Sequence, residues 1–281
     1  MARRNGSVVR QRQLGRTLRE LREEAGLTLE EAAPRLDWST SKLSRIEIAQ
    51  QSIDVHGVRS MLDLYGVGGD RWNQIIELTR DARQRGWWRA YGIDDQGYVP
   101  LETEASTVRD FTVSYVPGLL QTADYAREVF RSSLIRRTAA ELDNAITIRM
   151  IRQERLSSTE HPLELVAIVE EAVLRRPVGG PTVLRAQLAH IVQAAGLDLV
   201  TFQVLPLGVG AHPGMSAAFA ILSFDGLGEP DIVYVEHPIG AVQLQKETDV
   251  ARAKLVFDRL RSDALSPADS VALVQGLVDT I

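Results

Sequence analysis

Three groups of residues in the sequence have types that could do chemistry. Seven arginines and one glutamate fall within the first 22 residues, and guanidinium groups bind phosphate through paired hydrogen bonds. Two adjacent carboxylates, Glu170 and Glu171, follow further along the chain, and beyond them come His212, Glu236 and His237. Carboxylates and imidazoles can transfer protons or bind metal ions. The arginines therefore suggest a nucleic-acid partner, and the other two groups raise the question of an enzyme.

The charge of the chain is unevenly distributed. The 281 residues carry a formal net charge of −5, but residues 1–60 sum to +3 and the remainder to −8. A basic segment beside an acidic remainder indicates two modules with different partners, the basic one suited to phosphates. Charge alone equally allows a solvated, flexible N-terminal tail.

The acidic and histidine groups give little support to an enzyme. Adjacent residues on a helix or strand point apart, so Glu170 and Glu171 are better explained as charges at a helix start that pair with Arg175 and Arg176. His212, Glu236 and His237 have no local metal-ligand spacing and are expected to be loop or surface residues. The glycines of 208–214 do not fit the dinucleotide-binding fingerprint, and no phosphate-binding loop or nucleophile elbow is present. The absence of Cys excludes thiolate nucleophiles, iron–sulfur clusters and Cys-type zinc sites. From these observations together we expect no enzyme, no metal and no cofactor.

The N-terminal pattern predicts short helices. Leu14, Leu18 and Leu21 form one helical stripe that Gly26 ends. Thr28 and Glu31 have the spacing of a capping box, which starts a second helix. Ser39 can cap a third helix from Thr40 to about Ile48, and a fourth follows over 55–65. A second and third helix separated by a short turn describe a helix-turn-helix.

The rest of the chain predicts an α+β domain. Residues 89–103 suggest a linker or packed loop, and 104–116 a helix or mixed segment. Short β-rich runs, which indicate strands, lie at 163–169, 199–205, 217–224, 232–236 and 241–245. Helices are expected at 123–130, 139–156, 182–195, 249–261 and 268–278. A basic edge of the second of these helices is expected to be solvated and consists of Arg149, Arg152 and Arg155. The fold class is therefore multidomain: an all-α helix-turn-helix domain followed by a larger α+β domain.

Residues 27–33 (LTLEEAA) and 39–47 (STSKLSRIE) resemble the phage-repressor-like (XRE) helix-turn-helix family over about residues 12–67. The resemblance implies that the third helix enters the major groove with its N-terminal residues facing base edges. It gives four base-contacting candidates, Thr40, Ser41, Ser44 and Arg45. Among these, Arg45 is expected to dominate specificity by pairing with guanine, and Lys42 is better placed for a phosphate. Arg10 and Arg12, in a flexible arm with Arg3 and Arg4, are further phosphate candidates.

The same resemblance implies a structural ion pair and shows departures from the family. Arg22 and Glu47 occupy positions where the family keeps a partly buried ion pair between the first and third helices. Leu29 replaces a glutamine that often contacts phosphate, and Pro34 suggests a short or bent second helix. Asp37 and Ala49 replace two usual turn glycines.

From Trp87 to Ile281 the chain is similar to an uncharacterised domain that follows this helix-turn-helix in actinobacterial-type regulators, often in a toxin–antitoxin-like arrangement. The resemblance rests on Trp87-Trp88, 116–126, 149–156 and 170–176. We expect a flexible basic arm at 1–11, a DNA-binding domain at 12–67, a connecting helix at 68–86 and a regulatory and dimerisation domain at 87–281.

These observations predict a sequence-specific transcriptional regulator that binds double-stranded DNA as a homodimer. Its second domain would dimerise and sense a partner protein or an unknown small-molecule effector. The alternative is an antitoxin-like protein that mainly binds a small partner protein and regulates itself through DNA. No segment approaches the ~18 consecutive apolar residues of a membrane span, and the basic N-terminus lacks a following apolar region. We therefore expect a cytoplasmic protein with no membrane partner.

Overall fold

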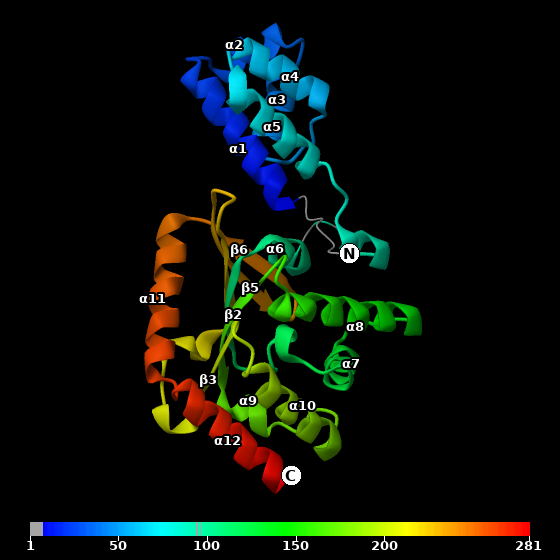
Figure 1. Cartoon of the computed structure of the whole chain (residues 1–281), viewed down its shortest axis with the longest axis vertical. Helices are drawn as coiled ribbons and strands as arrows, with labels where there is room; N and C mark the ends of the chain where they lie inside the picture. Colours follow the sequence, from blue (N-terminus) through cyan, green and yellow to red (C-terminus); the bar gives the residue numbers. More distant parts are fainter. Residues whose placement is uncertain (1–7, 94, 96) are drawn as a thin grey trace. The chain divides into compact units, whose positions relative to one another are not determined.

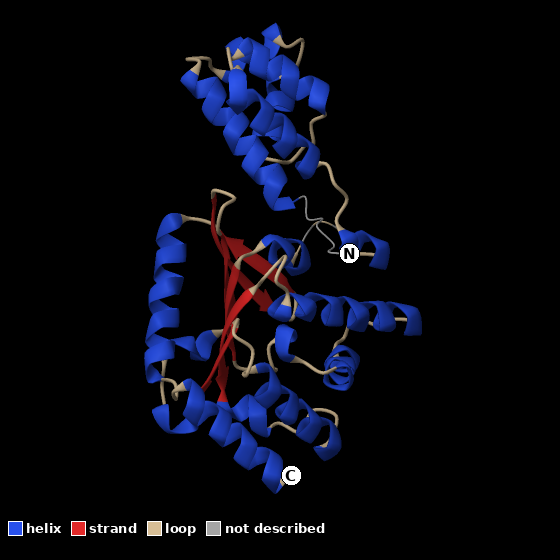
Figure 2. Cartoon of the chain, in the orientation of Figure 1, coloured by secondary structure: helices blue, strands red, loops and turns tan. Residues whose placement is uncertain are grey.

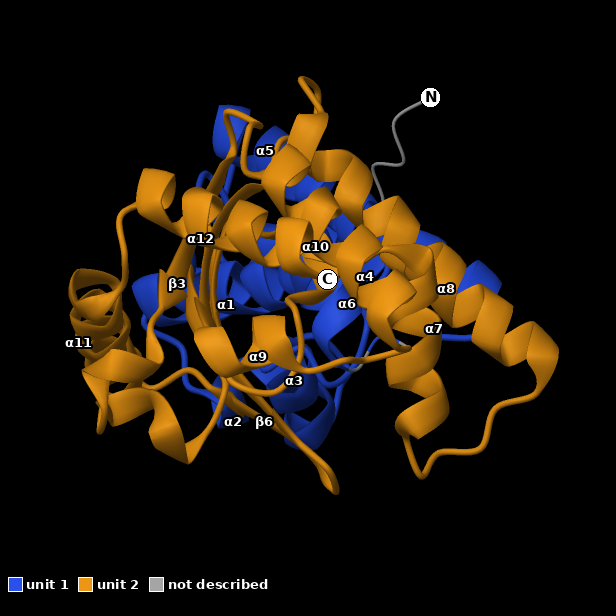
Figure 3. Ribbon diagram, turned by 90° about the horizontal axis from the view of Figure 1, so that it is seen from below, with its two compact units in different colours: residues 1, 3–104, 225–229 blue, residues 2, 105–224, 230–281 orange. Residues whose placement is uncertain are grey.

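The computed structural model describes residues 8–93, 95 and 97–281. These residues divide into two compact units, drawn in different colours in Figure 3. Unit 1 runs to Glu104 and includes Asp225–Glu229, and unit 2 consists of Ala105–Phe224 and Pro230–Ile281. Unit 1 is helical and unit 2 combines a six-stranded sheet with helices (Figure 2). The predicted fold class is confirmed.

Unit 1 contains six α-helices and one 3₁₀ helix among the described residues. They are α1 (Val8–Glu24), α2 (Leu29–Arg35), α3 (Thr40–Glu47), α4 (Val55–Leu64), α5 (Gly69–Ala82), η1 (Trp87–Tyr91) and α6 (Tyr98–Glu104). The predicted leucine stripe of α1 is buried against Leu43 of α3 and Leu62 of α4. Because most of these helices are too short to be stable alone, this shared core holds the unit together.

Side-chain caps fix where these helices begin. Thr28 and Glu31 form the predicted capping box at α2: the Glu31 amide donates to Thr28 Oγ1 at 3.3 Å, and the Thr28 amide donates to Glu31 Oε2 at 2.9 Å. Ser39 caps α3 by accepting from the Lys42 amide at 3.2 Å. The second helix is short, with seven residues including Pro34, as expected.

Two boundaries differ from those expected. Helix α1 begins at Val8, so residues 8–11 of the predicted arm are helical, and residues 1–7, with Arg3 and Arg4, lie outside the described part of the chain. Unit 1 also continues past residue 86 to Glu104. Glu104, at the end of α6, pairs with Arg10 of α1 at 3.4 Å and so joins α6 to the helical unit.

Unit 2 is built on one sheet with the strand order β3-β2-β1-β4-β5-β6. The strands are β1 (Thr107–Thr112), β2 (Glu164–Glu170), β3 (Val200–Leu205), β4 (Phe219–Phe224), β5 (Glu229–His237) and β6 (Gly240–Leu244). Strand β2 pairs with β1 and β3 in parallel, β1 pairs with β4 antiparallel, and β5 pairs with β6 antiparallel. The parallel strands need crossover connections, which the helices provide.

The helices of unit 2 cover both faces of the sheet. They are α7 (Ala123–Ser132), α8 (Ala139–Gln153), α9 (Glu171–Arg175), α10 (Pro181–Ala194), α11 (Glu247–Asp263) and α12 (Pro267–Thr280), and short 3₁₀ turns lie between them. Figure 1 shows α11 on one face and α7, α8 and α10 on the other. Val250, Phe257 and Leu260 of α11 pack on the sheet around Phe111.

The expectation for residues 104–116 was only partly right, because this segment contains β1. Strand β1 lies in the middle of the sheet between β2 and β4. Its central residues are Arg109 and Asp110, which obscure the apolar pattern of a buried strand. Arg109 is accommodated because its guanidinium donates to Ser223 Oγ at 3.2 Å on β4.

The arginines of α8 do not form the solvated edge that the sequence predicted. Arg149 donates to Gln121 Oε1, and Arg152 is only 8% exposed. Gln153 donates to the carbonyl oxygens of Gly118 at 3.0 Å and Gln121 at 2.7 Å. Gln153 thereby satisfies two carbonyl groups of the turn at 118–121, which would otherwise remain unpaired. Arg155, just after α8, donates to the Ala105 carbonyl oxygen at 2.6 Å.

Candidate nucleic-acid interface

The outer face of α3 carries an exposed stripe of side chains. Ser41, Arg45 and Ile48 are exposed, at the spacing i, i+4 and i+7, and Ile48 retains 53% of its accessible surface. Thr40 and Ser44 are half-buried beside them. The four predicted base-contacting residues therefore lie together on the accessible side of one helix, where a donor, an acceptor and a cation could meet base edges.

Sequence reasoning did not single out Ile48. Its exposed apolar side chain ends the Ser41–Arg45 stripe, where it could contact a thymine methyl group. Ile48 could have been predicted from the sequence, because it lies seven residues after Ser41 and therefore on the same helix face.

Two cations on α3 are already oriented within unit 1. The Arg45 Nε donates to the Ser41 carbonyl oxygen at 3.1 Å, one turn back on the same helix. The Lys42 Nζ lies 4.0 Å from the centre of the Trp38 ring, in cation–π contact. Lys42, which was predicted to contact a phosphate group, is thus held against the turn that precedes α3.

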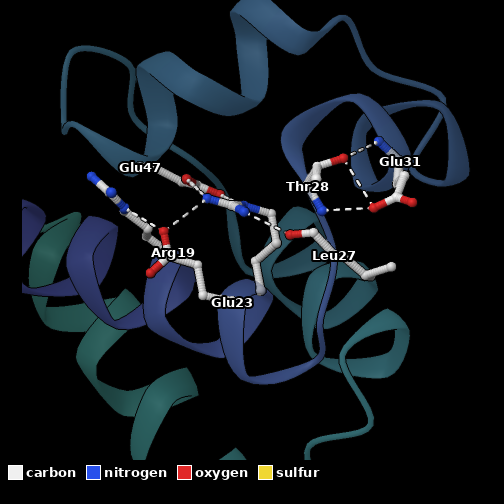
Figure 4. Close-up of polar contacts among 7 residues, drawn as sticks. Arg19, Glu23, Leu27, Thr28, Glu31 and Glu47 are labelled. Carbon is white, nitrogen blue, oxygen red and sulfur yellow. Dashed lines mark hydrogen bonds and ion pairs between the residues drawn. The ribbon is translucent and has the colours of Figure 1, made fainter.

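A buried ion pair anchors the C-terminal end of α3. Arg22 Nε donates to Glu47 Oε1 at 2.7 Å and Arg22 Nη2 to Glu47 Oε2 at 2.9 Å, and both residues are buried. A third bond runs from Arg22 Nη1 to the Leu27 carbonyl oxygen at 2.7 Å (Figure 4). Hydrogen bonding to Glu47 raises the pKa of the Arg22 guanidinium. One side chain of α1 thus fixes both the end of α3 and the loop before α2.

Gly15 of α1 sets how closely these helices approach. A Cβ atom placed on Gly15 would lie 2.6 Å from the Glu47 carbonyl oxygen and 2.9 Å from the Ile46 carbonyl oxygen. Real side chains do not tolerate such contacts with backbone, so only glycine fits here. Sequence reasoning did not single out Gly15, although a glycine inside a predicted helix is a signal of close packing.

In each of the two turns that flank α3, a residue other than glycine adopts a left-handed backbone conformation. Among the described residues, only Asp37 (φ 56°) and Ala49 (φ 57°) combine a positive φ with a side chain. These are the positions where the sequence lacks the usual glycines. Leu29, which replaces the phosphate-contacting glutamine, is half-buried and packs against the core of unit 1.

The prediction placed Arg10 and Arg12 in a flexible arm, but both residues lie in helix α1. Arg10 Nη1 pairs with Asp81 Oδ2 at 2.7 Å, in addition to its contact with Glu104. Arg12 is half-buried, and burial lowers the pKa of its guanidinium. A phosphate contact by Arg10 would require its two acidic partners to be displaced.

Glu170, Glu171 and His212 of unit 2 hold a loop, whereas Glu236 and His237 are exposed at the end of β5. Glu171 pairs with Arg175 at 2.7 Å, as expected, and accepts a hydrogen bond from the Leu207 amide at 3.1 Å. Glu170 pairs with His212 at 3.1 Å. Together they attach the segment after β3 to the end of β2. Among the described residues, no group of three or more His, Asp or Glu side chains could hold a metal ion.

Two family models match the chain. A helix-turn-helix domain model matches residues 13–73, which include α3 and its anchors. A second model, described as a domain of unknown function (DUF5753), matches residues 96–276, more than half of the chain. The chain belongs to the DUF5753 family. No curated protein and no solved structure matches it.

The DUF5753 match contains every strand of the sheet and the loop held by Glu170 and Glu171. In this DUF5753 chain, none of the helices within the described ranges has the length and hydropathy needed to cross a membrane.

Proposed function

We propose that the chain is a sequence-specific, DNA-binding transcriptional regulator of the phage-repressor-like (XRE) type, without enzymatic activity. One observation supports this most: α3 presents Ser41 and Arg45 outward while the buried pair of Arg22 and Glu47 fixes its opposite end. A recognition helix must be rigidly placed, because specificity depends on the positions of a few donors and acceptors relative to base edges.

We propose further that the regulator acts as a homodimer in the cytoplasm. A single small helix-turn-helix has a small footprint on DNA, and two copies on a two-fold-related site double the number of base contacts. Unit 2 would then hold the dimer together and receive the regulatory signal.

Selection from a random DNA library with the full-length chain tests this function. The selected DNA should contain two similar half-sites in inverted orientation, separated by about one helical turn. Affinity should decrease steeply with salt for any sequence, since phosphate contacts release counterions. Failure to enrich any sequence at low salt would contradict the proposal, and recovery of a stable protein complex from native extract without DNA binding would favour the antitoxin-like alternative.

A further inference from the structure

We propose that strand β6 is the surface through which two copies of this chain pair, by extending their sheets edge to edge. This inference rests on the proposed dimeric regulator and names the surface that joins its two subunits. Strand β6 is the last strand in the sheet order, so within the described chain no strand covers its outer edge. A strand edge presents backbone donors and acceptors that another strand can bind.

The opposite edge of the same sheet shows what a protected edge looks like in this protein. On β3, the Val204 amide donates to Ser270 Oγ at 2.9 Å, and the Val204 carbonyl oxygen accepts from the Leu265 amide at 2.9 Å. The Gln203 side chain also donates to the Leu265 carbonyl oxygen at 2.8 Å. The start of α12 and the loop before it therefore close that edge.

Strand β6 lacks two of the usual features that discourage pairing, charged side chains and a proline within the strand. Residues 238–245 (PIGAVQLQ) contain no charged side chain, and the one proline precedes the strand. Ile239, in the turn before β6, is 93% exposed, and Val242, in the middle of β6, is 44% exposed. Proteins commonly place lysine, proline or a bulge on an open edge to prevent association. An uncharged, exposed edge indicates a strand that pairs.

The apolar core of unit 2 also continues toward this edge. Val235 and Leu244 are partly buried against the core under α11. Val242 pairs with Val235 across the two strands and lies on the same face as Leu244, two residues away along β6. Pairing with another strand would cover Val242 and extend this core.

A second copy of the chain is the occupant that this edge fits. When two identical strands pair antiparallel about a two-fold axis, a side chain on the axis faces its own counterpart, and its neighbours face the residues placed symmetrically on the other strand. Charged residues would then repel each other, whereas β6 brings together Ala241, Val242 and Gln243, which do not. Because β6 has five residues, the paired edge is small. The dimer should therefore dissociate on dilution and be strengthened when two half-sites bind both copies.

The test compares oligomeric state by sedimentation velocity over a concentration series, without DNA. Val242→Lys should raise the dimer dissociation constant by roughly tenfold or more, because two lysines would face each other. Leu255→Lys is the matched control: Leu255 lies on α11, is 71% exposed, and its substitution should leave the constant unchanged. Circular dichroism checks that both variants fold.

Cross-linking provides a second readout that does not depend on how Val242→Lys folds. The chain has no cysteine, so single substitutions Ala241→Cys, Val242→Cys and Gln243→Cys can be treated with a short bismaleimide. At least one should cross-link quantitatively at concentrations where the chain is dimeric, and Leu134→Cys, at a position 99% exposed, should not. A chain that stays monomeric at every concentration, or a dimer in which none of the three cysteines cross-links, would overturn the inference. Neither result depends on DNA binding, so failure here is distinguishable from failure of the DNA selection.

Discussion

Gly15 and Glu47 are so close that a methyl group on Gly15 would lie 2.6 Å from the Glu47 carbonyl oxygen. This contact places the last turn of α3 directly against α1. It also brings Arg22, two turns further along α1, to the Glu47 carboxylate. The position of the proposed recognition helix therefore depends on a residue that has no side chain.

Gly15→Ala should destabilise unit 1 by ~1 to 3 kcal/mol, because the added methyl group overpacks a rigid backbone contact. Alanine alone would favour the helix by ~1 kcal/mol relative to glycine, so the predicted sign is opposite to helix propensity. Hydrogen exchange of α1 and α3 peptides in the full-length chain measures the effect locally. Gly276→Ala is the control: nothing lies within 4 Å of a Cβ at this position in α12, so α12 should become more protected. Increased protection of α3 in Gly15→Ala would show that the close contact is not needed.

The Arg22–Glu47 pair should behave as one unit in a double-mutant cycle. Arg22→Met leaves the Glu47 carboxylate buried without its partner, at a cost on the order of 3 to 5 kcal/mol. Arg22→Met combined with Glu47→Leu removes both charges and should recover most of that loss. The measurement is again hydrogen exchange of α3 peptides in the full-length chain. A local measurement is needed because unfolding of a two-domain protein need not be two-state. Losses that simply add in the double variant would contradict a direct coupling between the two side chains.

Ala49→Gly should stabilise unit 1 by ~1 kcal/mol, since a left-handed backbone costs alanine ~1 to 2 kcal/mol that glycine does not lose. Ala25→Gly serves as the matched control, because Ala25 is exposed at a turn and is not among the residues with positive φ. The control should be neutral or destabilising. If both substitutions changed the protection of α3 equally, backbone conformation at Ala49 would not be the cause.

Acid should weaken the helix caps of unit 1. Hydrogen bonds from the Thr28 amide and hydroxyl hold the pKa of Glu31 below its usual value, and the Gly57 amide does the same for Asp54. A carboxylate with a lowered pKa stabilises the fold above its unfolded pKa and loses this contribution as the pH falls through the folded pKa. The contribution should therefore be constant above about pH 5 and decrease below about pH 4. Carboxyl ¹³C chemical shifts followed by NMR give both pKa values directly, and values at or above those of model peptides would refute the prediction.

The sequence predicted most of the helices and strands because their signals are local. The spacing of Leu14, Leu18 and Leu21 and the capping box of Thr28 and Glu31 depend only on neighbouring residues, and the structure has both. The pairing of Arg22 with Glu47, 25 residues apart, was reached through a family resemblance and not from periodicity.

The features that sequence reasoning missed depend on tertiary neighbours. Strand β1 has Arg109 at its centre, which is tolerated because Ser223 on the next strand accepts its hydrogen bond. The arginines at the end of α8 were expected in solvent, but Arg149 donates to the Gln121 side chain and Arg152 is buried. Arg155, just after the helix, donates to the Ala105 carbonyl oxygen. The role of Gly15 depends on the backbone of α3, which no local pattern reveals.

The most direct test of the proposed function is the effect of Arg45→Ala on binding to selected and to random DNA. Arg45→Ala should lower affinity for the selected site by ~1 to 3 kcal/mol and relax specificity at one base pair, while binding to random DNA changes much less. Lys42→Ala should weaken binding to both DNAs to a similar extent, and Arg85→Ala, which removes an exposed charge beyond α5, should do little to either. Equal losses on selected and random DNA for Arg45→Ala would contradict the assignment of α3 as the recognition helix.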